Sequence, residues 1–134
     1  MKLSKIISRD KKSSKKQNDN PVIDWPDYVI TLDKKTLKPF IEKYPLSLVD
    51  FWAPWCKPCK AMTPRLRRLS KIYKGKVAFG RINTQENENV SKKYKIMGIP
   101  NFMFFSYGKK VASATGVKSV GDIKETIDSL LKKT

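Results

Sequence analysis

Two cysteines, Cys56 and Cys59, are the residues of this chain best suited to chemistry. They are its only cysteines, and they form a C-x-x-C pair. A bridge that closes so short a loop gains little chain-entropy stabilisation, which argues against a purely structural disulfide. A structural zinc site needs about four nitrogen or sulfur ligands, more than two thiols can supply. The spacing instead suits two thiols that form and break a disulfide reversibly.

The composition narrows the chemistry further. The chain has 134 residues, which favours one domain, and it contains no histidine. Ser-His-Asp chemistry, Cys-His proteases and histidine metal sites are therefore excluded, and we expect no metal. No apolar run approaches the roughly 18 residues that a membrane span needs, so we expect no membrane insertion.

The charge is strongly positive, with 29 Lys and Arg against 12 Asp and Glu and a net charge of +17. Residues 1–20 hold seven basic and two acidic residues without any aromatic side chain, which predicts a disordered basic arm. The arm has no apolar stretch of the kind a secretory signal needs. It is either a solubilising tail or a weak docking segment. The remaining residues, 21–134, are basic too but show no nucleic-acid motif, so we expect no specific nucleic-acid binding.

Strand-like and helix-like segments alternate in residues 21–134. The sequence predicts strands at 28–32, 46–52, 77–82, 101–106 and 111–115, and helices at 34–44, 57–73, 86–95 and from Ser119 onward. This alternation is typical of an α/β fold with a central mixed β-sheet and helices on both faces.

Apolar residues recur at helical spacing in three of the predicted helices. Pro39 forces either a late start or a kink in the first helix, and Pro64 predicts a kink in the second. Asp122 follows Ser119 in capping-box position. The predicted buried faces are Leu37, Phe40, Ile41 and Tyr44; Met62, Leu66, Leu69 and Ile72; and Val120, Ile123, Ile127, Leu130 and Leu131.

The cysteine pair falls where a predicted strand ends and a helix begins. The unpaired N–H groups and the dipole of a helix N-terminus favour a thiolate at Cys56, which is the nucleophilic form. Cys59, one turn further on, is placed to attack a mixed disulfide formed by Cys56. Pro58 suits a helix start. The charge of Lys57 should stabilise the thiolate further and make the couple more oxidising.

The segment Val49–Pro64, VDFWAPWCKPCKAMTP, resembles the active-site segment of the thioredoxin family. Lys93–Pro100 and Phe104–Gly116 resemble the family's cis-proline segment and the strand pair that follows it. The resemblance covers roughly residues 25–134. It implies a thioredoxin fold for the domain and thiol-disulfide oxidoreductase activity.

The resemblance also implies roles for residues around the thiols. Cys56 matches the family's attacking thiol and Cys59 its resolving thiol. Trp55, with Lys57 and Pro58, is expected at the contact surface. Pro100 matches the cis-proline, although it could simply be the first residue of a strand. The expected docking rim, which would pair with an extended substrate, consists of Gly98, Ile99, Pro100, Gly116 and Val117.

Asp50 lies in the middle of a predicted central strand, where a carboxylate is costly unless it is paired or protonated. A strand-end acid that reaches solvent or a salt bridge is one interpretation. The resemblance implies another, in which a buried aspartate takes the proton of the resolving thiol. The family's usual lysine on the next strand is Arg81 here, which cannot lose its proton. If the two residues are close, this fixed charge would hold Asp50 more firmly ionised.

We therefore expect a cytoplasmic, monomeric protein-disulfide reductase. It would act on disulfide-containing target proteins, be restored by a thioredoxin reductase, and use no bound cofactor, because the electrons travel through sulfur. One alternative is a disulfide oxidase or isomerase of the same fold, which needs an oxidising compartment. The other is a basic binding or scaffold protein with an incidental C-x-x-C pair.

Overall fold

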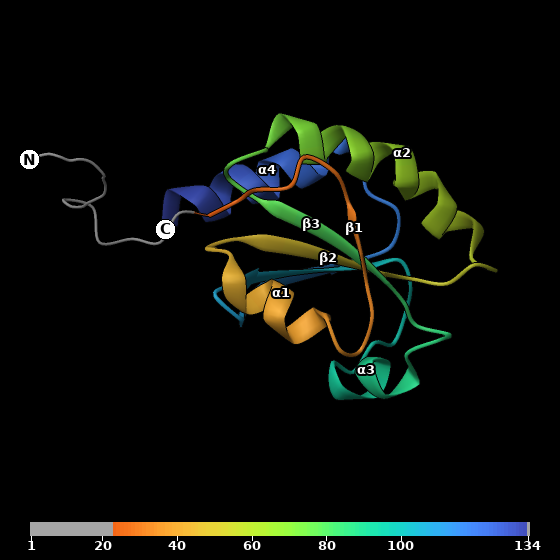
Figure 1. The fold of residues 1–134 in the computed structure, drawn as a ribbon. Helices are drawn as coiled ribbons and strands as arrows, with labels where there is room; N and C mark the ends of the chain where they lie inside the picture. The colour runs from red at the N-terminus through yellow and green to blue at the C-terminus, as the bar shows by residue number, and fades with distance from the viewer. Residues whose placement is uncertain (1–22, 134) are drawn as a thin grey trace, which may run out of the picture.

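The computed structural model describes residues 23–133, so the predicted arm at 1–20 lies outside the described residues. Strands and helices alternate in the predicted order (Figure 1). The elements are β1 (Ile30–Leu32), α1 (Leu37–Lys43), β2 (Ser47–Trp52), α2 (Lys57–Ile72), β3 (Ala78–Asn83), α3 (Glu88–Lys93), β4 (Asn101–Ser106), β5 (Lys109–Thr115) and α4 (Val120–Lys133).

The strands form one five-stranded sheet in the order β1-β3-β2-β4-β5. β1 and β2 both pair with β3 in parallel, whereas β4 pairs with β2 and β5 antiparallel. The predicted mixed sheet is therefore confirmed. β2 lies at its centre, and Asp50 on β2 is flanked by Arg81 on β3 and Phe102 on β4.

Helices cover both faces of the sheet, with α2 and α4 on one side and α1 and α3 on the other (Figure 1). Each pair of helices closes its own hydrophobic cluster against the strands. Leu48 of β2 belongs to the cluster under α2 and α4, whereas Val49 and Phe51 belong to the opposite one. Because side chains alternate along a strand, Asp50 faces the same side as Leu48, beneath α2.

The helix boundaries answer one question that the sequence left open. α1 begins late, at Leu37, so that Pro39 falls in its first turn, where its missing N–H is not needed. At α4 the backbone N–H of Asp122 donates to the Ser119 Oγ at 3.0 Å, as expected of a cap.

One predicted core position was wrong. Ile72, the last residue of α2, is 46% exposed. The buried row of α2 runs through Leu66 and Leu69 to Tyr73, which is 6% exposed. Tyr73 lies four residues after Leu69 and so continues the inward-facing row, whereas Ile72 falls to its side.

Gly80 in β3 tests how tightly the cluster under α1 is packed. A Cβ at this position would lie 2.5 Å from Leu32 Cδ1 and 3.2 Å from a ring carbon of Phe40. We expect Gly80→Ala to lower the free energy of unfolding by about 1–3 kcal/mol, because both side chains must shift. Urea unfolding measures this. Gly121→Ala in α4, where the nearest atom is 3.8 Å away, is the matched control and should be neutral or slightly stabilising. Equal loss in both variants would contradict the packing argument.

Candidate active site

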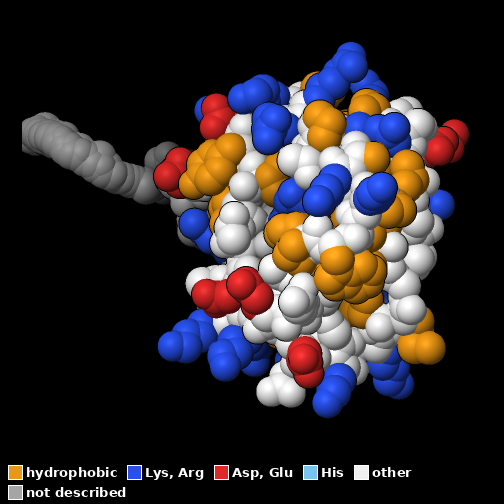
Figure 2. Space-filling view, turned by 90° about the vertical axis from the view of Figure 1, so that its right-hand side faces the viewer, with side chains coloured by type: hydrophobic (Ala, Val, Ile, Leu, Met, Phe, Trp, Pro, Cys, Tyr) orange, Lys and Arg blue, Asp and Glu red, His pale blue; other side chains and the backbone are white. Residues whose placement is uncertain are grey.

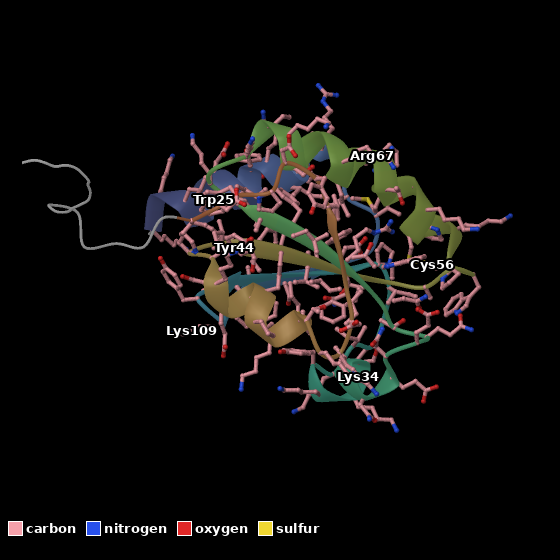
Figure 3. The ribbon with its side chains drawn as sticks, viewed as in Figure 1. Trp25, Lys34, Tyr44, Cys56, Arg67 and Lys109 are labelled. Carbon is pink, nitrogen blue, oxygen red and sulfur yellow. A yellow bond between two sulfur atoms is a disulfide. The ribbon has the colours of Figure 1, made fainter. Side chains whose placement is uncertain are left out.

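The two cysteines lie at the junction of β2 and α2 and form a disulfide, with their Cα atoms 5.3 Å apart. Cys56 is the N-cap residue of α2, and its Sγ accepts a hydrogen bond from the Cys59 N–H at 3.2 Å. Lys57 and Pro58 are the first two helical residues. Figure 3 shows Cys56 at the end of α2 that projects beyond the sheet. The predicted strand-to-helix placement is thus confirmed.

The cap has a direct chemical consequence. The Cys59 N–H, which bonds to Cys56 Sγ, is one of the backbone donors at the start of a helix that have no partner within the helix. Its hydrogen bond favours a negatively charged sulfur at Cys56. The first turn of α2 contains no acidic residue that would oppose this effect. Cys56 is 4% exposed and Cys59 is fully buried, so Cys56 is the more accessible sulfur. The arrangement suits an outer nucleophile and an inner resolving thiol.

The loop before β4 lies against the thiols. The Ile99 carbonyl oxygen is 3.9 Å from Cys56 Sγ, and the Ile99–Pro100 peptide bond is cis. The Gly116 N–H donates to the Pro100 carbonyl at 2.8 Å, which joins this loop to the end of β5. A Cβ on Gly98 would meet Thr115 at 3.2 Å, so this loop is in close contact with the end of β5. The predicted rim residues are therefore neighbours in space.

Exposed apolar side chains surround this junction. Trp55 is 70% exposed and Val117 is 46% exposed, although both are hydrophobic. Met97, two residues before Ile99, is 94% exposed and was not predicted. It lies in a loop without periodicity, so only its apolar character there could have marked it. Figure 2, which views this end of the molecule, shows hydrophobic side chains gathered on the surface with Lys and Arg above them.

Asp50 is completely buried and is paired with Arg81. The Arg81 Nε donates to Asp50 Oδ2 at 3.0 Å, and Arg81 Nη1 donates to Thr63 Oγ1 at 2.9 Å. The guanidinium also lies over the ring of Trp52, 4.5 Å from its centroid. Thr63 was not predicted to take part, because its contact depends on tertiary packing of α2 on the sheet. It follows Cys59 by one helical turn, so this network reaches the helix that carries the thiols.

Burial raises the pKa of Asp50 from an ordinary value of 3.8 to about 6, and the charge and hydrogen bond of Arg81 oppose the rise. Desolvation therefore outweighs the attraction of the fixed positive charge. Asp50 Oδ1 is buried and has no hydrogen-bond partner among the residues that the structure describes. The carboxylate thus keeps one oxygen free to accept a proton.

A second arginine holds the rim in place. Arg65 on α2 donates from Nη1 to the Lys118 carbonyl oxygen at 2.7 Å. Lys118 directly follows Val117, so this bond ties α2 to the segment that presents the exposed rim. The two residues are 53 positions apart in the sequence, and no local pattern predicts the contact.

The described part of the chain contains no group of three or more His, Cys, Asp or Glu side chains that could hold a metal ion. No helix within residues 23–133 has both the length and the apolar character to span a membrane.

Comparison with known proteins decides the family. The thioredoxin family model matches residues 28–129. The chain belongs to the thioredoxin family. It is 42% identical over 81 residues to a thioredoxin of Buchnera aphidicola, a match that covers 60% of this chain and 75% of that relative. It is 38% identical over 84 residues to the chloroplastic M-type thioredoxin of Spinacia oleracea, covering 63% of this chain but only 46% of that relative.

The fold agrees with this assignment. The structure resembles a mutant thioredoxin from Halobacterium salinarum with a TM-score of 0.75 and 25% identity. The match covers 81% of this chain and 95% of that one. With the Cys56–Cys59 pair at disulfide distance, these likenesses identify a thiol-disulfide oxidoreductase with the disulfide-reductase function of thioredoxins.

The burial of Asp50 predicts a pH-dependent stability. The native state keeps the Asp50 proton to a higher pH than the unfolded chain does, because the pKa rises from 3.8 to about 6. Relative to Asp50→Asn, the parent protein should therefore lose about 3 kcal/mol of unfolding free energy as the pH rises from about 4 to above 6. Denaturant unfolding at several pH values measures the difference between the two proteins.

Asp33 provides a control of opposite sign. Backbone hydrogen bonds from Lys35 and Thr36 lower the pKa of this exposed carboxyl. Relative to Asp33→Asn, the parent should gain stability as the pH rises through the acid range. A difference between the parent and Asp50→Asn that stays constant from pH 4 to pH 7 would contradict the burial argument.

Lys57 gives a prediction for the redox couple. Lys57 is exposed and follows Cys56 directly, so its positive charge should stabilise the thiolate, and with it the reduced form. We expect Lys57→Gln to lower the reduction potential by about 10 mV, the equivalent of a surface charge pair worth ~0.5 kcal/mol. Equilibration in glutathione buffers at pH 7 measures the potential. Lys38→Gln on α1 removes the same charge on the far side of the sheet and should leave the potential unchanged. A higher potential for Lys57→Gln would contradict the argument.

Proposed function

We propose that Cys56 is the attacking thiol of this reductase and Cys59 the resolving thiol. The Cys56 thiolate attacks one sulfur of a target disulfide, which forms a mixed disulfide and releases the other sulfur as a thiolate. The Cys59 thiolate then attacks Cys56 Sγ and releases the second target sulfur. The target gains two electrons and two protons, and the Cys56–Cys59 disulfide forms. The observation that carries this proposal is the position of Cys56 Sγ at the start of α2, where the Cys59 N–H bonds to it.

Asp50 is proposed to accept the proton of Cys59. A pKa of about 6 leaves most Asp50 carboxylates ionised at pH 7, while protonation remains accessible. The free Oδ1 supports this role, since Oδ2 is occupied by Arg81. Arg81 acts as a positioning residue that fixes the carboxylate.

The target is proposed to dock as an extended segment along the rim. The Ile99 backbone lies next to Cys56 Sγ and offers a place for main-chain pairing. The exposed ring of Trp55 and the exposed side chain of Val117 offer apolar contact to the target. The proposed docking residues are Trp55, Lys57, Pro58, Gly98, Ile99, Pro100, Gly116 and Val117.

The cellular setting is also a proposal. A dithiol that reduces protein disulfides needs a reducing compartment, which favours the cytoplasm. A thioredoxin reductase would restore the dithiol, and no bound cofactor is required because sulfur carries the electrons. The protein would act as a monomer, since a target must reach the rim around Cys56. Residues 21–134 would form the thioredoxin domain.

Two serine variants test the roles of the thiols. With a protein disulfide as substrate, Cys56→Ser should lower the rate of reduction by more than about 1000-fold, because no attacking thiolate remains. Cys59→Ser should instead accumulate a mixed disulfide that mass spectrometry detects. A mixed disulfide trapped by Cys56→Ser, and not by Cys59→Ser, would reverse the assignment. Undiminished biological activity of Cys56→Ser would favour the scaffold alternative.

The equilibrium reduction potential separates the reductase from an oxidase or isomerase. A value near the roughly −270 mV of thioredoxins supports the proposed direction of electron flow. A value of roughly −120 to −180 mV would reverse that direction.

A further inference from the structure

The charged side chains of α2 and of the turn that follows it are all positive. Residues 57–76 contain eight Lys and Arg residues and no Asp or Glu. Amphipathic surface helices ordinarily mix both signs, because pairs three or four residues apart stabilise the helix. Repulsion between like charges at this spacing costs stability instead. Helix stability therefore does not explain this run of eight positive charges.

Five of these cations share one exposed side of α2. Successive residues turn by about 100° around a helix, which places the five within roughly 100° of its circumference. Met62, Leu66 and Leu69, which are fully buried, lie on the opposite side. The five exposed residues, here called the α2 basic stripe, are Lys57, Lys60, Arg67, Arg68 and Lys71.

The stripe begins at the nucleophile and runs away from it. Lys57 follows Cys56 directly, and Lys71 lies 14 residues further along, which corresponds to roughly 21 Å of helix. Figure 3 shows Cys56 and Arg67 on α2, with Arg67 well along the helix from the thiol. Lys57 belongs both to the stripe and to the proposed docking residues, and Figure 2 shows Lys and Arg side chains next to hydrophobic ones on this end of the molecule. The positive surface is thus continuous with the proposed docking rim.

Within the described residues, no carboxylate forms an ion pair with the stripe. The ion pair between Arg81 and Asp50 is the only one between residues of the range 23–133, and neither residue belongs to the stripe. Asp128 on the neighbouring helix α4 is a carboxylate, but its Oδ1 accepts a 2.7 Å hydrogen bond from the hydroxyl of the buried Tyr73. The stripe therefore offers charge to a molecule outside the chain.

We propose that the α2 basic stripe binds an acidic segment of the target protein that flanks the target's reactive disulfide. The proposal rests on the proposed attack by Cys56, which places a polypeptide at the start of the stripe. The adjoining rim of exposed Trp55 and Val117 suits a polypeptide better than a phosphate backbone. A target bound at both surfaces would present its disulfide to Cys56 and its Asp and Glu residues to α2. Acidic disulfide proteins are thereby selected over neutral ones.

Two peptides and two triple variants test this selection. Each peptide carries one intramolecular disulfide, followed by four Glu residues in one and four Gln residues in the other. The stripe variant is Arg67→Gln/Arg68→Gln/Lys71→Gln, which leaves Lys57 and Lys60 beside the thiols intact. The control variant is Lys34→Gln/Lys38→Gln/Lys92→Gln, which removes three exposed charges near α1 and α3. Figure 3 shows Lys34 on that side of the molecule, away from α2.

The readout is the ratio of kcat/KM for the Glu peptide to kcat/KM for the Gln peptide at low ionic strength. We expect the parent and the control variant to share a ratio above one, and the stripe variant to lower it about fivefold. The parent's ratio should approach one at about 0.5 M salt, where charges are screened within a few ångströms. An equal loss in the control variant, or no loss in the stripe variant, would overturn the proposal.

Two further outcomes are informative. Reduction of both peptides by the parent at equal rates contradicts the acidic-target proposal alone, whereas reduction of neither contradicts the proposed attack by Cys56 as well. Polyglutamate and a duplex DNA of equal charge then serve as competitors for the Glu peptide. Stronger inhibition by polyglutamate supports an acidic protein segment as the partner of the stripe. Stronger inhibition by the DNA overturns the proposal in favour of a nucleic acid.

Discussion

The pairing of β2 with a strand on each side is the constraint on which the active site depends. β2 hydrogen-bonds to β3 and β4 and is covered by helices on both faces, so its end is fixed in all directions. Cys56 follows this end by four residues, with its N–H bonded to the Ala53 carbonyl. The sheet therefore holds the start of α2 in a fixed position. The same enclosure buries Asp50, and burial is what moves its pKa toward neutrality.

Arg81, which stands where the family usually has a lysine, fits this enclosed position. The guanidinium has several donors in a plane, and here they reach Asp50 and Thr63 while the flat face lies over Trp52. A lysine could offer a point charge but not this planar contact. Arg81 lies against Asp50, and its charge and hydrogen bond favour the ionised carboxylate, as expected if the two are close. The cost of removing the carboxylate from water is larger than this attraction, so the pKa still rises to about 6.

Local patterns predicted the elements of the fold, whereas contacts between distant segments escaped them. The periodicity that marked Leu66 and Leu69 is a property of neighbouring residues, and the structure confirms it. The prediction for Ile72 was wrong because residues three and four positions after Leu69 both fit a helical spacing. Tyr73, four positions on, is the one that faces the core. The bonds from Arg65 to the Lys118 carbonyl and from Arg81 to Thr63 join residues 53 and 18 positions apart. Their geometry is set by the tertiary packing of α2, which no sequence pattern reports.

The strand order leaves β5 at one edge of the sheet within the described chain. Such an edge presents unpaired backbone groups that can template a strand from another copy. β5 begins with Lys109 and Lys110, both exposed, and the register between β4 and β5 shifts just after them, because Phe105 pairs with Lys110 but Phe104 pairs with Ala112. Like charges and an irregular ladder both oppose edge-to-edge growth of the sheet. At high concentration this edge therefore resists fibril formation through electrostatic repulsion, and salt weakens that protection.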